Sequence, residues 1–150
     1  MKKNDVFVVL TRSAGVLLLA AVLMGMGGKN AGPQKIPSPE QNYSVAIIDR
    51  AEVRTEASMF SIDGYVYFFG RKGKGQLAVP FNKIKTADFR QTPDGLEVKL
   101  VFRDGRETIL AVDRDRQCYG KTGIGNIQVG LDDVKMILFG DKPPDAAPRN

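Results

Sequence analysis

The sequence predicts an all-β domain, either a β-sandwich or a partly closed β-barrel. We expect about eight to ten short strands, built from two tandem repeats and preceded by an N-terminal signal or anchor segment. Three observations predict this class. Apolar and polar residues alternate along several segments, a glycine-rich stretch recurs after fifty residues, and no amphipathic helical pattern of useful length follows residue 28.

The N-terminal segment has the layout of an export signal. Lys2, Lys3 and Arg12 are followed by an uncharged, largely apolar run, which is typical of a secretory signal peptide over residues 1–28. Residues 6–28 are also long enough for an uncleaved signal anchor, in which Arg12 would have to snorkel toward the headgroups. Either version directs the rest of the chain out of the cytoplasm, so we expect a periplasmic protein or one anchored in the inner membrane.

Proline-rich segments flank the expected domain. Residues 29–43 hold three prolines among polar residues and predict an extended linker, and residues 140–150 hold three more and predict a disordered tail. The β-domain is therefore expected over residues 44–139. Basic and acidic residues nearly balance from Ser44 onward, so nothing there indicates nucleic-acid binding.

The clearest strand pattern lies in residues 96–112. Apolar residues alternate with polar ones in its first half, and Asp104-Gly105 then predicts a type I′ hairpin turn with two positive-φ positions. Asp-Gly recurs at 63–64 and 94–95. Further strands are expected at 44–49, 52–58, 65–69, 76–81 and 126–131, with tight turns at 82–85 and 132–135 and short closing strands at 86–89 and 136–139.

Residues 70–89 align without a gap with residues 120–139, which indicates a duplicated unit. The repeats are expected to cover about 44–89 and 96–139. Because both copies keep the glycines, we interpret the glycine-rich stretches as hairpin loops of the scaffold rather than as a ligand site. The identical pairs are Gly70/Gly120, Gly73/Gly123, Gly75/Gly125, Val79/Val129, Lys85/Lys135 and Phe89/Phe139.

Several chemistries are excluded by composition. Histidine is absent and Cys118 is the single cysteine, which rules out Ser-His and Cys-His nucleophile pairs, imidazole metal ligation and thiolate zinc sites. The GKT at 120–122 lacks the first glycine of a P-loop, and 113–124 lacks most ligands of a calcium loop, so its alternating Asp and Arg predict solvated charges. We expect no metal and no cofactor. Cys118 is expected to be a small buried apolar residue.

Carboxylates leave one enzymatic alternative. Asp63, Asp113, Asp132 and Asp133 each fall at an expected turn, where aspartate stabilises the local backbone. The sequence therefore favours a protein that is not an enzyme. The alternative is a small envelope hydrolase that uses paired aspartates in a concave site.

One patch suggests binding. Tyr65 and Tyr67 precede the cations Arg71, Lys72 and Lys74, and aromatics beside cations can contact sugars or anionic headgroups. The competing interpretation is that the aromatics belong to the core and the basic tip keeps a strand edge soluble.

The run of residues 79–85, Val-Pro-Phe-Asn-Lys-Ile-Lys, closing at Phe89, resembles a motif of small exported bacterial all-β proteins of uncharacterised function. The resemblance covers 79–89 and 129–139, where Gly130 and Asp133 depart from it. It implies an exported β-domain and carries no catalytic residues.

These observations together predict an exported, non-catalytic β-module of the cell envelope that acts by binding. The partner is expected to be an envelope protein, through exposed strand edges, or an anionic glycan or lipid surface, through the basic patch. The identity of the ligand, the oligomeric state and the fate of residues 1–27 stay open.

Overall fold

The computed structural model describes residues 36–140 and the backbone of residues 145 and 146. The expected signal or anchor segment, residues 1–28, lies outside the described residues. Within the described part of the chain no helix is long and apolar enough to span a membrane.

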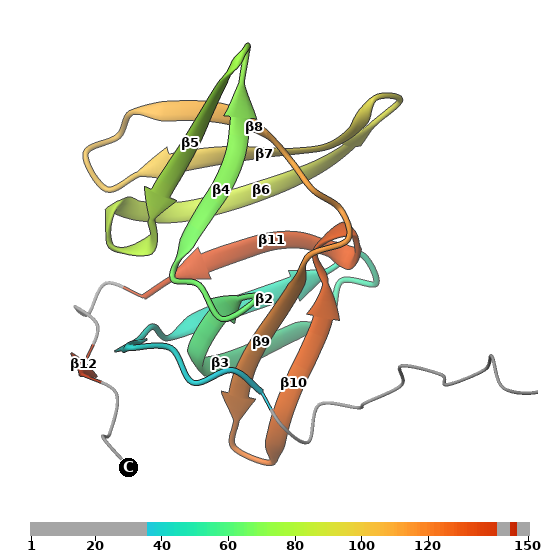
Figure 1. The fold of residues 1–150 in the computed structure, drawn as a ribbon. Coiled ribbons are helices and arrows are strands. Elements are labelled where there is room, and N and C mark those ends of the chain that lie inside the picture. Colours follow the sequence, from blue (N-terminus) through green and yellow to red (C-terminus); the bar gives the residue numbers. More distant parts are fainter. Residues whose placement is uncertain (1–35, 141–144, 147–150) are drawn as a thin grey trace, which may run out of the picture. The chain divides into compact units, whose positions relative to one another are not determined.

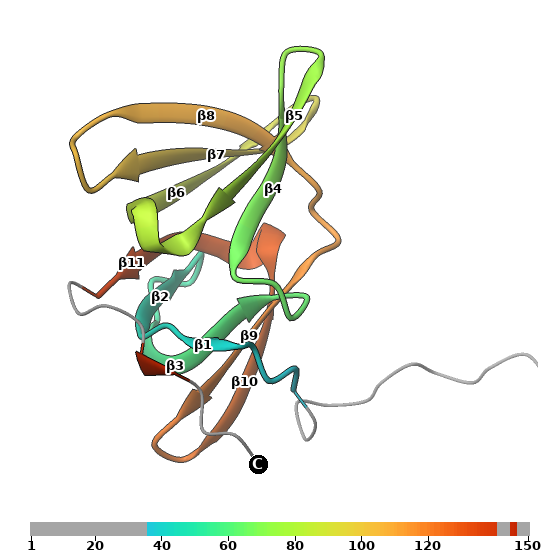
Figure 2. The same ribbon diagram turned by 60° about the vertical axis from the view of Figure 1, so that its left-hand side comes forward.

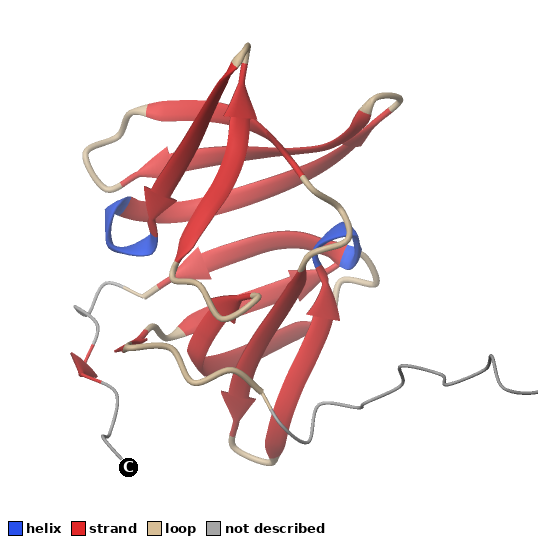
Figure 3. Cartoon of the chain, in the orientation of Figure 1, coloured by secondary structure: helices blue, strands red, loops and turns tan. Residues whose placement is uncertain are grey.

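The prediction of an all-β fold is confirmed (Figure 3). Strands are joined by short turns, and the helical elements among the described residues are two single 3₁₀ turns, η1 (Phe81–Lys83) and η2 (Leu131–Asp133). The strands are β1 (Gln41–Asn42), β2 (Val45–Asp49), β3 (Arg54–Ile62), β4 (Tyr67–Lys72), β5 (Gly75–Pro80), β6 (Ile84–Thr92), β7 (Gly95–Phe102), β8 (Glu107–Val112), β9 (Gln117–Thr122), β10 (Gly125–Gly130), β11 (Val134–Phe139) and β12 (Asp145–Ala146).

Ten of these strands form one curled antiparallel sheet, in the order β10-β9-β3-β2-β11-β6-β7-β8-β4-β5 (Figure 1). The short strands β1 and β12 pair with each other. The sheet has two halves that meet where β11 pairs with β6, from Met136↔Asp88 to Leu138↔Thr86. One half, β4 to β8, comes from the continuous residues 67–112, and the other combines β2 and β3 with β9, β10 and β11.

Elements of the chain recur at an interval of fifty residues. Strands β4 and β5 and the turn η1 begin at residues 67, 75 and 81, and β9, β10 and η2 begin at 117, 125 and 131. At this spacing the counterparts are β2 and β7, β3 and β8, β4 and β9, β5 and β10, and β6 and β11. Replacing each strand by its counterpart gives the same strand order in reverse; for example, β3 pairs with β9 and β8 pairs with β4. The β4–β5 hairpin therefore pairs with β8, and the β9–β10 hairpin pairs with β3.

The three Asp-Gly pairs do not share one turn type. Asp63 and Gly64 both have positive φ, at 50° and 87°, which is a type I′ turn closed by hydrogen bonds between Ile62 and Tyr65. The prediction of a type I′ turn at Asp104-Gly105 is wrong, because only Gly105 has positive φ there.

The reason is local to the β7–β8 connection. Four residues, 103–106, separate the two strands, and the carboxylate of Asp104 accepts a hydrogen bond of 3.0 Å from the backbone N–H of Arg106. The N–H of Gly105 donates to the carbonyl of Phe102 at 3.0 Å. This longer loop needs a left-handed residue only at the glycine.

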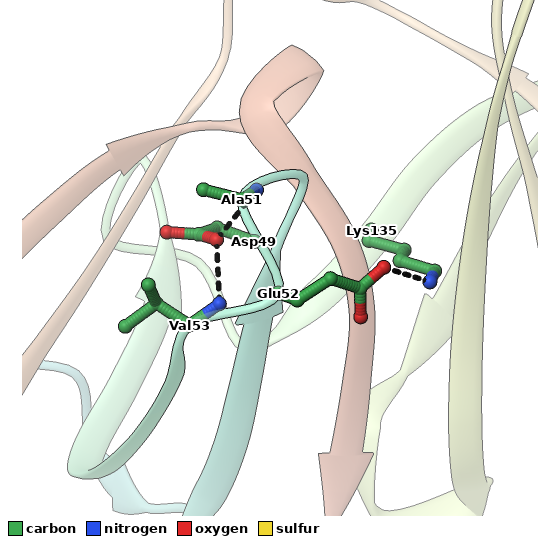
Figure 4. Close-up of polar contacts among 5 residues, drawn as sticks. All are labelled: Asp49, Ala51, Glu52, Val53 and Lys135. Atoms are coloured by element: carbon green, nitrogen blue, oxygen red, sulfur yellow. Dashed lines mark hydrogen bonds and ion pairs between the residues drawn. The ribbon is translucent and has the colours of Figure 1, made fainter.

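Asp49 organises the turn between β2 and β3 (Figure 4). Its Oδ1 accepts hydrogen bonds from the backbone N–H groups of Ala51, at 2.8 Å, and Val53, at 2.9 Å. Glu52 between them has φ of 62°, and its carboxylate forms an ion pair with Lys135 of β11. The turn is thus attached to the neighbouring strand β11 as well as to its own hairpin.

Phe81 lies at the centre of the core. Its ring centroid is 5.1 Å from that of Phe139, 5.3 Å from Phe68, 5.4 Å from Phe60 and 5.5 Å from Tyr43. These aromatic rings come from both halves of the sheet, so the two halves share one hydrophobic core. The turn η1 places Phe81 there at the end of β5.

Gly70 and Gly120 occur where strands approach closely. A Cβ on Gly70 would lie 2.9 Å from both the carbonyl oxygen of Ala111 and the Cβ of Leu110, and one on Gly120 would lie 2.9 Å from the Cβ of Ala57. Neither glycine has positive φ. The absence of a side chain therefore lets β4 and β9 pack against the neighbouring hairpin.

The packed region begins before residue 44. Tyr43, expected in the linker 29–43, is 5% exposed and its ring packs edge-on against Phe81, and Pro39 is buried as well. At the other end the backbone of β12, in the expected tail 140–150, pairs with β1 (Figure 2).

Candidate functional site

Strand β4 presents a row of side chains on its outer face. Phe68 is buried in the core, and since successive side chains in a strand point to opposite faces, Tyr67, Phe69 and Arg71 point outward. Tyr65, just before the strand, joins them, with its ring centroid 5.2 Å from that of Tyr67. Tyr65 is 51% exposed and Phe69 is 37% exposed, which is unusual for large aromatic rings.

The five residues of the binding patch that the sequence predicts do not all lie on the same face of the sheet. Tyr65, Tyr67 and Arg71 lie along one face, whereas Lys72 lies on the opposite face and donates a hydrogen bond of 2.9 Å to Oγ1 of Thr108 in β8. Lys74 lies in the two-residue turn between β4 and β5. The five residues therefore do not form a single surface.

Arg71 instead belongs to an open groove of about 580 Å³. Three segments form it: the end of β4 with its neighbour Gln76, the tip of the β6–β7 hairpin, and the connection from β8 to β9, which runs down the right-hand side of Figure 1. The lining residues are Phe69, Gly70, Arg71, Gln76, Pro93, Asp94, Gly95, Leu96, Ala111, Val112, Asp113, Arg114 and Arg116.

Three arginines line this groove: Arg71, Arg114 and Arg116. In the described part of the chain, neither Arg71 nor Arg114 has an ion pair with a carboxylate. The guanidinium of Arg116 lies over the ring of Phe69 at 5.5 Å and is 3.6 Å from a carboxylate oxygen of Asp63. These contacts hold its planar group in place along the groove.

The Nε atom of Arg116 is buried and has no hydrogen-bond partner within the described residues. A buried donor without a partner is costly in a folded protein, and such atoms therefore require an explanation.

Two of the three groove arginines have no basic residue fifty positions earlier in the chain. The residues at those positions are Gly64, for Arg114, and Val66, for Arg116. Of the three groove arginines, only Arg71 has a basic counterpart at this spacing, which is Lys121.

The candidate aspartates are placed differently from one another. Asp63 accepts a hydrogen bond of 3.0 Å from the N–H of Gln117 and contacts Arg116, and Asp113 accepts one of 3.0 Å from the N–H of Asp115. Asp113 therefore stabilises its own turn, as expected, whereas Asp63 connects its turn to the start of β9, 54 residues later in the chain. Asp113 also lines the groove, together with Asp94 from the β6–β7 tip.

The remaining two candidates, Asp132 and Asp133, lie in the turn η2 and do not line the groove. Across the described residues no group of three or more His, Cys, Asp or Glu side chains is placed to hold a metal ion.

Cys118 is fully buried in β9 within the hydrophobic core, as the sequence predicts. Burial raises the pKa of its thiol, and the negative charge of Asp63 adds to this effect. The thiol therefore stays protonated and unreactive in the folded protein.

Sequence reasoning missed Phe69, Arg114 and Arg116 as members of the groove. Phe69 could have been found, because it alternates with the buried Phe68 and precedes Arg71 by two positions. Arg114 and Arg116 carry no such signal, because they lie in an irregular connection whose path depends on the whole sheet.

Comparisons with known proteins give a family but no activity. A family model described as an uncharacterised protein matches residues 39–142. An uncharacterized protein of Aquifex aeolicus (strain VF5) is 26% identical over 110 residues, which cover 73% of this chain and 83% of the Aquifex protein. No solved structure matches the chain. The match to the family model spans most of the chain and nearly the whole described domain, so the protein belongs to this family of uncharacterised proteins.

Proposed function

We propose that the protein is an exported, non-catalytic module of the cell envelope that binds an anionic glycan in the arginine groove. The observation that supports this most directly is the convergence of Arg71, Arg114 and Arg116 on one open groove, with the first two lacking ion pairs in the described structure. Guanidinium groups bind carboxylates and phosphates through paired hydrogen bonds. Export is an expectation from the N-terminal sequence.

The mixed chemistry of the groove favours a sugar over a lipid headgroup. Asp94 and Asp113 can accept hydrogen bonds from sugar hydroxyls, and the exposed ring of Phe69 offers a face for the apolar side of a pyranose. A lipid surface needs a protruding basic face, whereas these arginines line a recess between three segments. An acidic sugar unit satisfies all of these groups together.

The test compares two pairs of charge-removing variants. The double variant Arg71→Gln and Arg114→Gln removes two cations from the groove, and Lys72→Gln with Lys74→Gln removes two cations from the same hairpin outside it. Both variants change the net charge equally. Binding of trigalacturonate to the purified full chain is measured by calorimetry, with uncharged maltotriose and phosphatidylglycerol vesicles as further ligands.

We expect trigalacturonate to bind the wild-type chain and the lysine variant alike, and to bind the arginine variant at least about tenfold more weakly, since each charge-assisted contact contributes about 1.5 kcal/mol or more. Maltotriose should bind more weakly than trigalacturonate. Equal losses in the two variants would mean attraction by net charge alone, and binding of vesicles without trigalacturonate would identify a lipid surface; either result overturns the proposal.

We also propose that the segments of about 44–89 and 96–139 arose by duplication of one unit of about fifty residues. The identical residues at 70–89 and 120–139, the matching starts of β4 and β9, and the common need for glycine at Gly70 and Gly120 support this. Such an origin would also account for the strand order of the sheet, which is reversed when each strand is replaced by its counterpart fifty residues away.

A hydrolase is the second candidate, and the shared groove of Asp94 and Asp113 favours it. Two carboxylates beside a bound sugar can act as acid and base. Under this alternative, Asp94→Asn and Asp113→Asn would each abolish release of reducing ends from oligogalacturonate while leaving binding intact. Under the binding proposal, the wild-type chain releases none.

A further inference from the structure

The strand β5 is one end of the ten-stranded sheet, and in the described part of the chain only β4 pairs with it (Figure 2). Its six residues, Gly-Gln-Leu-Ala-Val-Pro, include no charged side chain, and Leu77 is 41% exposed. Natural edge strands are usually protected by charged residues, bulges or covering segments against pairing with other chains. Here only Pro80, at the end of the strand, gives such protection.

The register of the β4–β5 hairpin identifies the backbone groups that face outward. The two-residue turn makes Lys72↔Gly75 the closing hydrogen-bonded pair, and hydrogen-bonded pairs then alternate with unbonded ones. Gln76 and Ala78 fall in the unbonded pairs, so their N–H and C=O groups point away from β4. Pro80 is the next in this series and has no N–H to offer.

Unpaired cations lie at both ends of this edge. Lys74 is exposed in the turn at one end, and Lys83 is exposed in η1 just beyond the other; neither has an ion pair in the described structure. Lys83 borders a shallow apolar groove that also contains Val79 and Pro80. The edge is thus an uncharged strand with positive charge at each end.

We propose that β5 accepts an extended segment of a partner protein whose middle residues are uncharged and whose two ends carry acidic residues. The partner adds an eleventh strand to the sheet through the outward N–H and C=O groups of Gln76 and Ala78. Its acidic ends are matched by Lys74 and Lys83. This proposal does not rest on the proposed glycan function, because it uses backbone groups at the edge of β5; Gln76 is the residue that also lines the arginine groove.

A second copy of this chain is a poorer occupant. Antiparallel pairing of β5 with another β5 about Leu77 would place Lys74 of each copy opposite Pro80 of the other, three residues before Lys83, so the pairing brings no complementary charge to the cations. An acidic segment has the complementary charge.

The opposite edge strand, β10, offers an internal comparison. It is also uncharged, but the residues that correspond to Lys74 and Lys83 are Ile124 and Asp133. The side chain of Gln128, the counterpart of Ala78, contacts Gln117 at 3.4 Å. The β10 edge therefore lacks the cations that would select an acidic partner.

The test uses a fluorescent peptide, Glu-Asp-Thr-Val-Thr-Val-Thr-Asp-Glu, and the same core with lysines at the ends. Fluorescence polarisation is measured with the purified full chain and three variants. Ala78→Pro removes an outward N–H from β5, Gln128→Pro makes the matched change on β10, and Arg71→Gln with Arg114→Gln disables the arginine groove. Far-UV circular dichroism checks that each variant is folded, because proline is tolerated at outward positions of edge strands.

We expect the acidic peptide to bind the wild-type chain at least about tenfold more tightly than the lysine peptide, and to bind Ala78→Pro at least about fivefold more weakly. Gln128→Pro and the arginine variant should bind it as the wild type does. N-methylation of alternate backbone nitrogens that face β5 should abolish binding. The proposal is overturned by no binding up to about 1 mM peptide, by equal binding of the lysine peptide, by equal losses in the two proline variants, or by a dimer of the chain that the peptide does not disrupt.

If Ala78→Pro fails to fold, the charge-reversed pair Lys74→Glu and Lys83→Glu replaces it. This pair should reverse the preference and favour the lysine peptide. A loss of peptide binding in the arginine variant alone would show that the peptide binds in the arginine groove, and would also refute binding at the β5 edge. Failure of the glycan proposal leaves these outcomes unchanged.

Discussion

Gly70 allows the sharpest test of the packing between β4 and β8. In Gly70→Ala the new Cβ would lie 2.9 Å from the carbonyl oxygen of Ala111, 2.9 Å from the Cβ of Leu110 and 3.1 Å from Val112. Such overpacking costs about 1–3 kcal/mol. Removing a glycine also restricts the unfolded chain, which stabilises the protein by about 0.4–1 kcal/mol. We therefore expect a net loss of about 1.3 kcal/mol in the free energy of unfolding, the difference between the middle values of the two ranges.

Gly75, in the same hairpin, is the matched control. A Cβ there would meet only the carbonyl oxygen of Lys72 at 3.6 Å, which is an ordinary contact, and φ at Gly75 is not positive. Gly75→Ala should therefore gain about 0.4–1 kcal/mol. With a urea dependence of about 1–3 kcal/mol per molar, the midpoints of the two variants should differ by about 1 M.

The assay is urea unfolding of the purified full chain followed by far-UV circular dichroism. Equal midpoints for Gly70→Ala and Gly75→Ala would refute the reasoning, because only the crowding at residue 70 distinguishes the two sites. Gly120→Ala should behave like Gly70→Ala, since its Cβ would meet Ala57 at 2.9 Å.

Three further predictions concern single side chains. Phe81→Ala should lower the free energy of unfolding by about 3–5 kcal/mol, measured by urea unfolding, because it empties the centre of the aromatic core; a loss below about 1 kcal/mol would contradict that placement. The Cys118 thiol should react with Ellman's reagent only upon unfolding, since it is fully buried and its pKa is raised; rapid reaction of the folded protein would show that β9 opens locally. Hydrogen bonds from the backbone and side chain of Arg106 lower the pKa of Asp104, so its stabilising effect is present above the ordinary value of 3.8 and is lost as pH falls through the lowered pKa. By NMR titration, Arg106→Ala should move this pKa up, toward 3.8, without fully restoring it, because the backbone contact remains; an unchanged pKa would exclude the side-chain contribution.

Local patterns predicted the strands well. The alternation in residues 96–102 predicts β7, and the shared glycines predict the turns that follow β4 and β9, because both signals depend only on neighbouring residues. The same rule separates Arg71 from Lys72, since adjacent side chains of a strand point to opposite faces. Grouping them as one patch overlooked this consequence of the strand assignment.

Long-range packing limited the rest. The prolines around Tyr43 predict a linker, yet its ring is buried against Phe81, thirty-eight residues away along the chain. Arg114 and Arg116 enter the groove because the connection from β8 crosses to β9 in the other half of the sheet. Neither outcome can be predicted without knowing which strands pair.

The division of the sheet has a consequence for synthesis of the chain. The half formed by β4 to β8 can pair internally once residue 112 has emerged, and only β6 then still lacks a neighbour, the later strand β11. The hairpin β2–β3 is made first but lacks its neighbours β9 and β11 until the last strands arrive. Among the strands of the ten-stranded sheet, the first two to be synthesised are therefore among the last to find their neighbours, and β2 and β3 stay exposed for most of synthesis.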